Sequence, residues 1–146
     1  MYCIHHEVGM AIANLGIMKW LHENGVPWTN DTFAQAAYHG DIDTMKWLYE
    51  KGCPWGMWTF NNAVEHGDLK NMKWLHKKGC LWGENTFTWA ACHGDIDNMK
   101  WLYKKECPWG YANIEDLRGG IGIQFVKANI VQWMQENGCP KFDYDY

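Results

Sequence analysis

The apolar positions between residues 29 and 55 predict a pair of short helices. Phe33, Ala36 and Ala37 lie at positions i, i+3 and i+4, which places them on one face of a helix. Gly40 can supply the left-handed backbone that ends this helix, and Gly52 can end the next one. The apolar stripe of the second helix consists of Ile42, Met45, Leu48 and Tyr49. The predicted unit is therefore helix, tight turn, helix and loop.

Polar residues at the expected helix starts support this assignment. Asp31 or Thr32 is the expected N-cap of the first helix, and Thr32 with Gln35 has the spacing of a capping box. Asp41 is the expected N-cap of the second helix. Pro54 follows the second helix and prevents its continuation.

The same pattern recurs along the chain every 27 residues. Strings related to Trp47-Leu48-Tyr49 begin at Trp20, Trp74 and Trp101, and a weaker copy surrounds Trp133. A fixed period of this kind indicates a stack of like units. We expect one all-α domain over residues 1–140, with repeats at about 1–28, 29–55, 56–82, 83–109 and 110–140 and a tail at 141–146. The first half of the first copy departs from the pattern, which is typical of a terminal cap.

Two departures from the repeat lead to local predictions. Glu106 stands where the other copies have the helix-ending Gly52 and Gly79, and a left-handed backbone costs a residue with a Cβ about 1–2 kcal/mol. We expect this turn to be rearranged or slightly strained. Near the C-terminus, a longer helix is expected from about Ile123 to Asn137.

The string from Thr32 to Gly52 resembles an ankyrin repeat, with its paired alanines and two helix-ending glycines. It is similar in particular to the tryptophan-rich ankyrin repeat proteins of large DNA viruses of amoebae. The resemblance implies a helix-turn-helix solenoid that binds proteins through its first helices. The period is shorter than the usual ankyrin period of about 33 residues. The missing residues correspond to the β-hairpins, so we expect a stack of about five short repeats that lacks them.

Composition narrows the classes of function. The chain has 146 residues and a formal charge of -4, whereas nucleic-acid binders usually carry a basic patch or stripe. The sequence has no apolar run long enough for a membrane span and no secretory signal pattern. We expect an intracellular protein of the cytoplasm, or of the host cytoplasm if it is viral, with no nucleic-acid or membrane partner.

The cysteines and histidines are expected to be structural. Cys53, Cys80 and Cys107 occupy one repeat position, and stacked helices lie about 8–10 Å apart, too far for disulfides. The same spacing separates the recurring histidines His39, His66 and His93, so neighbours cannot share one zinc ion. Cys3 with His5 and His6 is a weak terminal metal candidate, and Cys92-His93 lacks a third group for nucleophilic catalysis. No cofactor is expected.

Nine of the 11 tryptophans occupy repeat positions, so we expect them to pack between repeats. Trp58 and Trp89 do not. On a helical projection they point away from the face that carries the phenylalanine and the paired alanines. Exposed tryptophan and tyrosine commonly anchor protein interfaces. The surface that we expect to bind a partner, the first-helix face, comprises Tyr38, Met57, Trp58, Asn62, Glu65, Trp89 and Tyr111.

These observations favour a non-catalytic protein–protein interaction module whose partner, a host protein in the viral case, binds the first-helix face. Alternatively, Trp58 and Trp89 fold over the stack and only shield it. Two other classes of function stay open. One is a self-assembling repeat protein that forms a homo-oligomer, and the other is a metal-binding protein that uses cysteine and histidine.

Overall fold

A computed structural model describes residues 14–29, 31–56, 58–93, 95–110 and 127–139. These residues form eight α-helices and no strand, which confirms the all-helical prediction. The chain divides into two compact units, residues 1–81 and 82–146. Each unit is described by itself.

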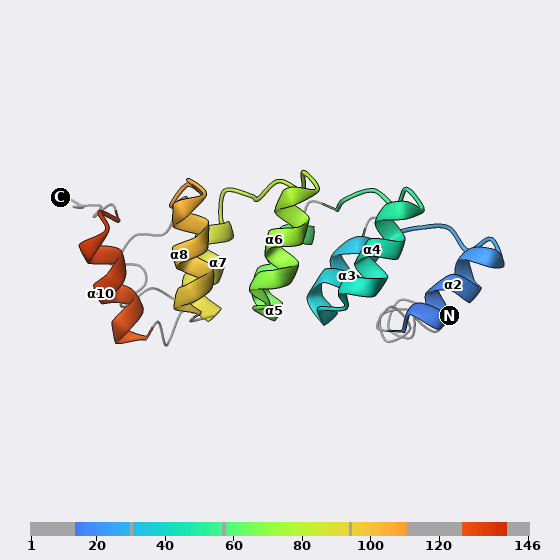
Figure 1. Ribbon diagram of the computed structural model, residues 1–146, viewed down its shortest axis with the longest axis horizontal. Coiled ribbons are helices and arrows are strands. Elements are labelled where there is room, and N and C mark those ends of the chain that lie inside the picture. The colour runs from blue at the N-terminus through green and yellow to red at the C-terminus, as the bar shows by residue number, and fades with distance from the viewer. Residues whose placement is uncertain (1–13, 30, 57, 94, 111–126, 140–146) are drawn as a thin grey trace, which may run out of the picture. The chain divides into compact units, whose positions relative to one another are not determined.

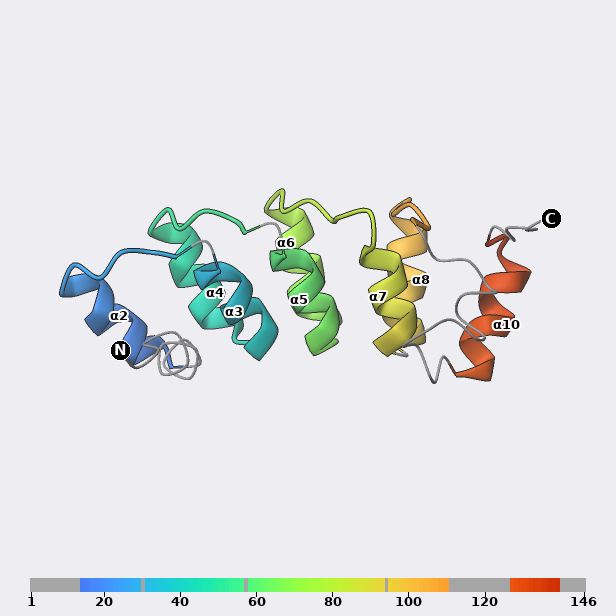
Figure 2. The ribbon, with the colours of Figure 1, turned by 180° about the vertical axis from the view of Figure 1, so that it is seen from behind.

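The described residues of the first unit form five helices (Figure 1). Their bounds are α2 (Leu15–Glu23), α3 (Thr32–His39), α4 (Ile42–Glu50), α5 (Thr59–His66) and α6 (Leu69–Lys77). Helix α3 packs against both α4 and α5, α5 packs against α6, and α2 lies beside α4. Figure 2 shows α3 and α5 side by side, as the first helices of neighbouring repeats.

The second unit contains three described helices. They are α7 (Thr86–His93), α8 (Ile96–Lys104) and α10 (Ala128–Glu136), and α7 packs against α8. The predicted start of the last helix at Ile123 is wrong. Lys127 has the extended backbone angles φ −59° and ψ 140°, so α10 begins only at Ala128. The apolar residues upstream of Lys127 misled the prediction, and residues 123–126 lie outside the described ones.

The periodic apolar residues form the core. Phe33, Phe60 and Phe87 are fully buried at the same position of three first helices, each beside two buried small residues. The second helices contribute the fully buried residues Met45, Leu48, Met72, Leu75, Met99, Leu102, Ile130 and Met134. Helical periodicity identified most of the buried positions, because residues at i, i+3 and i+4 share one side of a helix. Tyr49, which was predicted as part of the apolar stripe, is an exception, because 40% of it is exposed.

Threonine closes the turn before the first helices α3, α5 and α7. The backbone N–H of Thr29 donates to Oγ1 of Thr32 (2.8 Å), and the N–H of Thr32 donates to the carbonyl of Thr29 (3.1 Å). Thr59 and Thr86 bind residues three positions upstream in the same way. The predicted capping box is therefore wrong, because the Thr32 hydroxyl bonds backwards into the turn. Asp31 is the N-cap residue, but its side chain makes no capping hydrogen bond.

Asp41 caps α4 as predicted. The carboxylate of Asp41 accepts hydrogen bonds from the backbone N–H groups of Asp43 and Thr44. Asp95 caps α8 in the same manner. These bonds satisfy N–H groups that a helix leaves without partners at its start.

The turn at Glu106 keeps the geometry of the glycine turns. Glu106 has φ 60°, in the left-handed region, and Gly52 and Gly79 have φ 78° and 90°. The N–H of Glu106 bonds to the carbonyl of Tyr103 (2.9 Å), as Gly52 bonds to Tyr49 (3.1 Å). Of the two predicted outcomes, strain is observed and rearrangement is not, because the hydrogen bonds of the turn are retained.

Polar contacts join neighbouring repeats in the first unit. The Asn62 side-chain amide donates to the carbonyl of Ala34 (3.1 Å), and the Asn71 amide donates to the carbonyl of Gly40 (2.9 Å). Gly40 is left-handed, with φ 72°, and a Cβ built on it would lie 2.0 Å from Nε2 of His66. Because these contacts join residues within one position of equivalence in α3 and α5, the two helices run parallel and nearly in register.

Candidate functional site

The periodic tryptophans form aromatic clusters between repeats. In the first unit, Trp47 lies on the second helix of one repeat and meets Trp28 and His22 of the preceding repeat, with ring centroids 5.9 and 5.5 Å apart. The next cluster joins Tyr49, Trp55 and Trp74 at 5.6–6.5 Å. The second unit repeats the arrangement with Tyr103, Trp109 and Trp133.

These contacts confirm that the tryptophans of the three clusters pack between repeats. Their side chains are only partly buried, however, unlike the phenylalanines of the core. Trp20 differs from its equivalents, because 60% of it is exposed. Replacing a periodic tryptophan is therefore not expected to lower the free energy of unfolding by the same amount at every position.

Two predicted site residues of the first unit are exposed. Tyr38, near the end of α3, is 43% exposed, and Trp58, the N-cap residue of α5, is 49% exposed. Because α3 and α5 run parallel and nearly in register, the seven-position offset between these residues separates them by about 10 Å along the helix axes. They therefore provide two separate aromatic contact points on the layer formed by the first helices α3 and α5.

The other described residues of the predicted first-helix face in the first unit are partly buried. Asn62 is partly buried and its amide is engaged by the carbonyl of Ala34, so it links repeats. Glu65 is partly buried on α5. Met57 and Tyr111 lie outside the described residues.

Trp89 belongs to the second unit and is 37% exposed on α7. Its ring stacks on His93 with centroids 5.6 Å apart, and Nδ1 of His93 lies 2.8 Å from the carbonyl oxygen of Trp89. One face of the indole is thus supported by its own helix. This support fixes the ring orientation and leaves part of the indole open to solvent.

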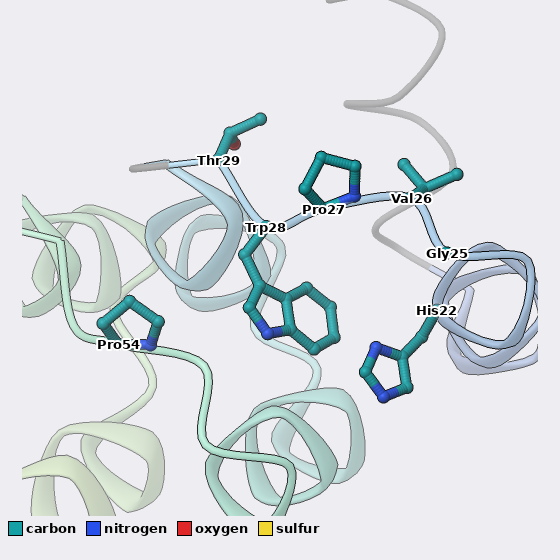
Figure 3. Close-up of a pocket in the computed structure, with 7 residues that line it drawn as sticks. All are labelled: His22, Gly25, Val26, Pro27, Trp28, Thr29 and Pro54. Atoms are coloured by element: carbon teal, nitrogen blue, oxygen red, sulfur yellow. The ribbon is translucent and has the colours of Figure 1, made fainter.

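A hollow beside the loop after α2 was missed by the sequence analysis. It has a volume of about 520 Å³ and is lined by His22, Gly25, Val26, Pro27, Trp28, Thr29 and Pro54. Figure 3 shows the Trp28 and His22 rings side by side below the loop, and their centroids are 4.7 Å apart. A similar hollow at Tyr103 and Trp109 occurs in the second unit. The sequence feature that could have predicted these hollows is the aromatic residue after each Trp-Leu pair, such as His22 and Tyr103.

The described cysteines are free thiols, and those of the repeat loops are buried. Burial raises the pKa of Cys53 to about 11, and burial raises the pKa values of Cys80 and Cys107 to about 12. Thiols with such pKa values are poor nucleophiles, because the thiolate is the reactive form. Their prediction as small buried apolar groups is confirmed.

The described residues contain no cluster of three or more His, Cys, Asp or Glu side chains that could hold a metal ion. His66 instead packs over Gly40, which gives the histidine a structural role in the stack. The terminal candidate at Cys3, His5 and His6 lies outside the described residues.

Within the described part of the chain, every helix is too short or too polar to cross a bilayer. No protein family model, curated protein or solved structure matches this sequence.

Proposed function

We propose that the chain is an ankyrin-like solenoid that acts as a non-catalytic protein-binding module through its first-helix face. The exposure of Trp58 and Tyr38 is the observation that carries this proposal. Large aromatic side chains are expensive to leave in water, and full burial of one stabilises a protein by about 1.5–3 kcal/mol.

The scaffold holds together without these two rings. Phe33 and Phe60 fill the interior between the helices, and the bond from Asn62 to Ala34 joins α3 to α5. The tryptophans of the three aromatic clusters, in contrast, are in contact with neighbouring repeats. Trp58 and Tyr38 are therefore available to a partner at little cost to stability.

The chemistry of the first-helix face suits a protein partner. Tryptophan and tyrosine supply large apolar contact areas with few rotatable bonds, and both are enriched at binding hot spots. Trp89 provides the same kind of contact in the second unit, with its ring held by His93. The expected setting is the cytoplasm, and the free thiols of the described cysteines fit its reducing conditions.

The test is affinity capture from amoebal cytoplasmic lysate, with retained proteins identified by mass spectrometry. The baits are the unaltered chain, the Trp58→Ser, Trp89→Ser double variant and a Trp20→Ser variant. Trp20→Ser is the matched control, because it removes an exposed tryptophan that lies on a second helix. Circular dichroism and urea denaturation establish that all three baits fold.

We expect a protein that the unaltered chain and Trp20→Ser retain and that the double variant loses. Equal retention by all three baits would refute the assignment of the binding surface to the first helices. The single variants Tyr38→Ser, Trp58→Ser and Trp89→Ser then locate the contact within each unit, because each removes one ring.

A further inference from the structure

A lysine covers an aromatic ring inside the first unit. Nζ of Lys78 lies over the Tyr49 ring, 5.1 Å from its centroid. Lys78 is the C-cap residue of α6, four positions after Trp74, and Trp74 meets the Tyr49 ring edge-on with centroids 5.9 Å apart. A cation within about 6 Å of a ring centroid is attracted by the negative face of the ring. The aromatic cluster between repeats therefore offers a site for a cation, and the first unit fills it with its own lysine.

The equivalent cluster of the second unit has asparagine at the position of this lysine. Tyr103 meets Trp133 edge-on with centroids 5.5 Å apart, which reproduces the geometry of the Tyr49 cluster. The C-cap residue of α10, four positions after Trp133, is Asn137. Its amide donates to the carbonyl of Trp133 (2.8 Å), and its carbonyl accepts from the Tyr103 hydroxyl (3.4 Å). Asn137 thus holds the Tyr103 hydroxyl and brings no cation to the ring, and 41% of Tyr103 is exposed.

The exposed ring of Tyr103 lines a hollow that also contains an acidic residue. The hollow has a volume of about 510 Å³ and is lined by Tyr103, Lys104, Glu106, Cys107, Pro108 and Trp109. Glu106 stands where the Tyr49 repeat has Gly52, and it keeps a left-handed φ of 60°. Non-glycine residues in this strained conformation are concentrated at ligand sites and switch regions. The strained turn therefore places a carboxylate beside the aromatic ring.

We propose that this hollow binds a lysine side chain of a partner protein. Its ammonium group takes the place on Tyr103 that Lys78 takes on Tyr49. The carboxylate of Glu106 is the counter-charge. The methylene stem packs on the indole of Trp109, because lysine side chains bury their stems along apolar surface while the charged group stays in water.

The similar hollow of the first unit provides an internal comparison. It lies at His22 and Trp28 (Figure 3), and among the residues that the structure describes in its lining none is a tyrosine or an acidic residue. The position of Glu106 is Gly25 there. The first hollow is therefore not expected to select a cation. Both hollows are built from the end of a second helix and the following loop, so the lysine site is separate from the first-helix face.

Nuclear magnetic resonance titration of the unaltered chain with the peptide acetyl-Gly-Lys-Gly-amide tests the site. The control peptide has norleucine in place of lysine, which keeps the methylene stem and removes the charge. We expect the lysine peptide to shift the indole N–H signal of Trp109 with a dissociation constant of about 1–10 mM. The indole signal of Trp28 should stay nearly unchanged. The norleucine peptide should bind about fivefold more weakly.

Variants of the lining residues assign the contacts. Glu106→Gln removes the charge, keeps the shape of the side chain and should weaken binding about two- to fivefold. Tyr103→Leu should weaken binding by a similar factor, whereas Tyr103→Phe keeps the ring and should bind like the unaltered chain. Lys104→Gln removes a competing cation and should strengthen binding. Asp97→Asn is the matched charge control, because Asp97 lies in the first turn of α8, and it should leave the affinity unchanged.

Three results would overturn the proposal. Equal affinity for the lysine and norleucine peptides would mean that the hollow is an apolar pocket, and this comparison needs no variant, so it decides the question even if Tyr103→Leu does not fold. An affinity unchanged in the folded Glu106→Gln and Tyr103→Leu variants would place the peptide elsewhere on the chain. The third is the absence of a saturable shift at Trp109 up to about 50 mM peptide.

Discussion

Replacing Glu106 by glycine is expected to stabilise the protein. Glu106 has φ 60° and the same turn hydrogen bonds as Gly52 and Gly79. A Cβ built on either glycine would meet no atom within 4 Å. The turn therefore has space for a side chain, and the cost at Glu106 arises from the backbone conformation alone.

The magnitude is the difference between two backbone effects. A left-handed residue with a Cβ costs about 1–2 kcal/mol, and glycine loses about 0.5–1 kcal/mol more than alanine through the entropy of the unfolded chain. Glu106→Gly should therefore raise the free energy of unfolding by about 1 kcal/mol. Asparagine tolerates this conformation better than glutamate, so Glu106→Asn should give a smaller gain.

Urea denaturation followed by far-ultraviolet circular dichroism measures these changes. Gly52→Glu is the matched reverse variant, because it introduces the same side chain into an equivalent, open turn. It should lower the free energy of unfolding by about 1 kcal/mol. If Glu106→Gly is neutral or destabilising while the denaturant dependence is unchanged, backbone strain at this turn is not the controlling factor.

Three further predictions test other parts of the structure. Gly110→Ala should destabilise the second unit by about 2–3 kcal/mol or shift the loop, because its Cβ would lie 1.8 Å from the Glu84 carbonyl oxygen. Urea denaturation would measure the loss of stability, and a crystal structure of the variant would show any shift of the loop. Trp74→Ala should lower the free energy of unfolding by about 2 kcal/mol, less than the loss of a fully buried tryptophan. Trp58→Ser should change it by less than about 0.5 kcal/mol. Equal losses would contradict the distinction between rings that pack between repeats and rings that are available to a partner. Burial raises the pKa of Cys80 to about 12 from 9.0, so the folded state holds the proton more tightly than the unfolded state. The stability that this provides is complete below pH 9 and declines as pH rises toward 12, so Cys80→Ala should reduce the loss of stability between pH 8.5 and 10.5 in urea titrations.

The aromatic residues show where the sequence informed the candidate site and where it did not. Their 27-residue period predicted that most tryptophans pack between repeats, and the off-period positions of Trp58 and Trp89 correctly marked two exposed rings. The helical projection that placed Asn62 on the first-helix face could not show that its amide also meets the carbonyl of Ala34. The loop hollow at Trp28 was missed for a related reason: it forms from residues that recur in the sequence but meet only when repeats stack.

The sequence alone determined the all-helical fold, the repeat length, most of the buried positions and the Asp41 cap of α4. These features depend on interactions within about four residues, since the helical period and a capping bond are local. Tertiary structure decided which helix faces meet, how Thr32 uses its hydroxyl, and that Glu106 adopts a left-handed backbone. The packing of neighbouring helices fixes the turn at Glu106 more strongly than its local preference opposes it. The exposed edge at Trp20 likewise became apparent only from the structure, because identical residues are covered in one repeat and open in another.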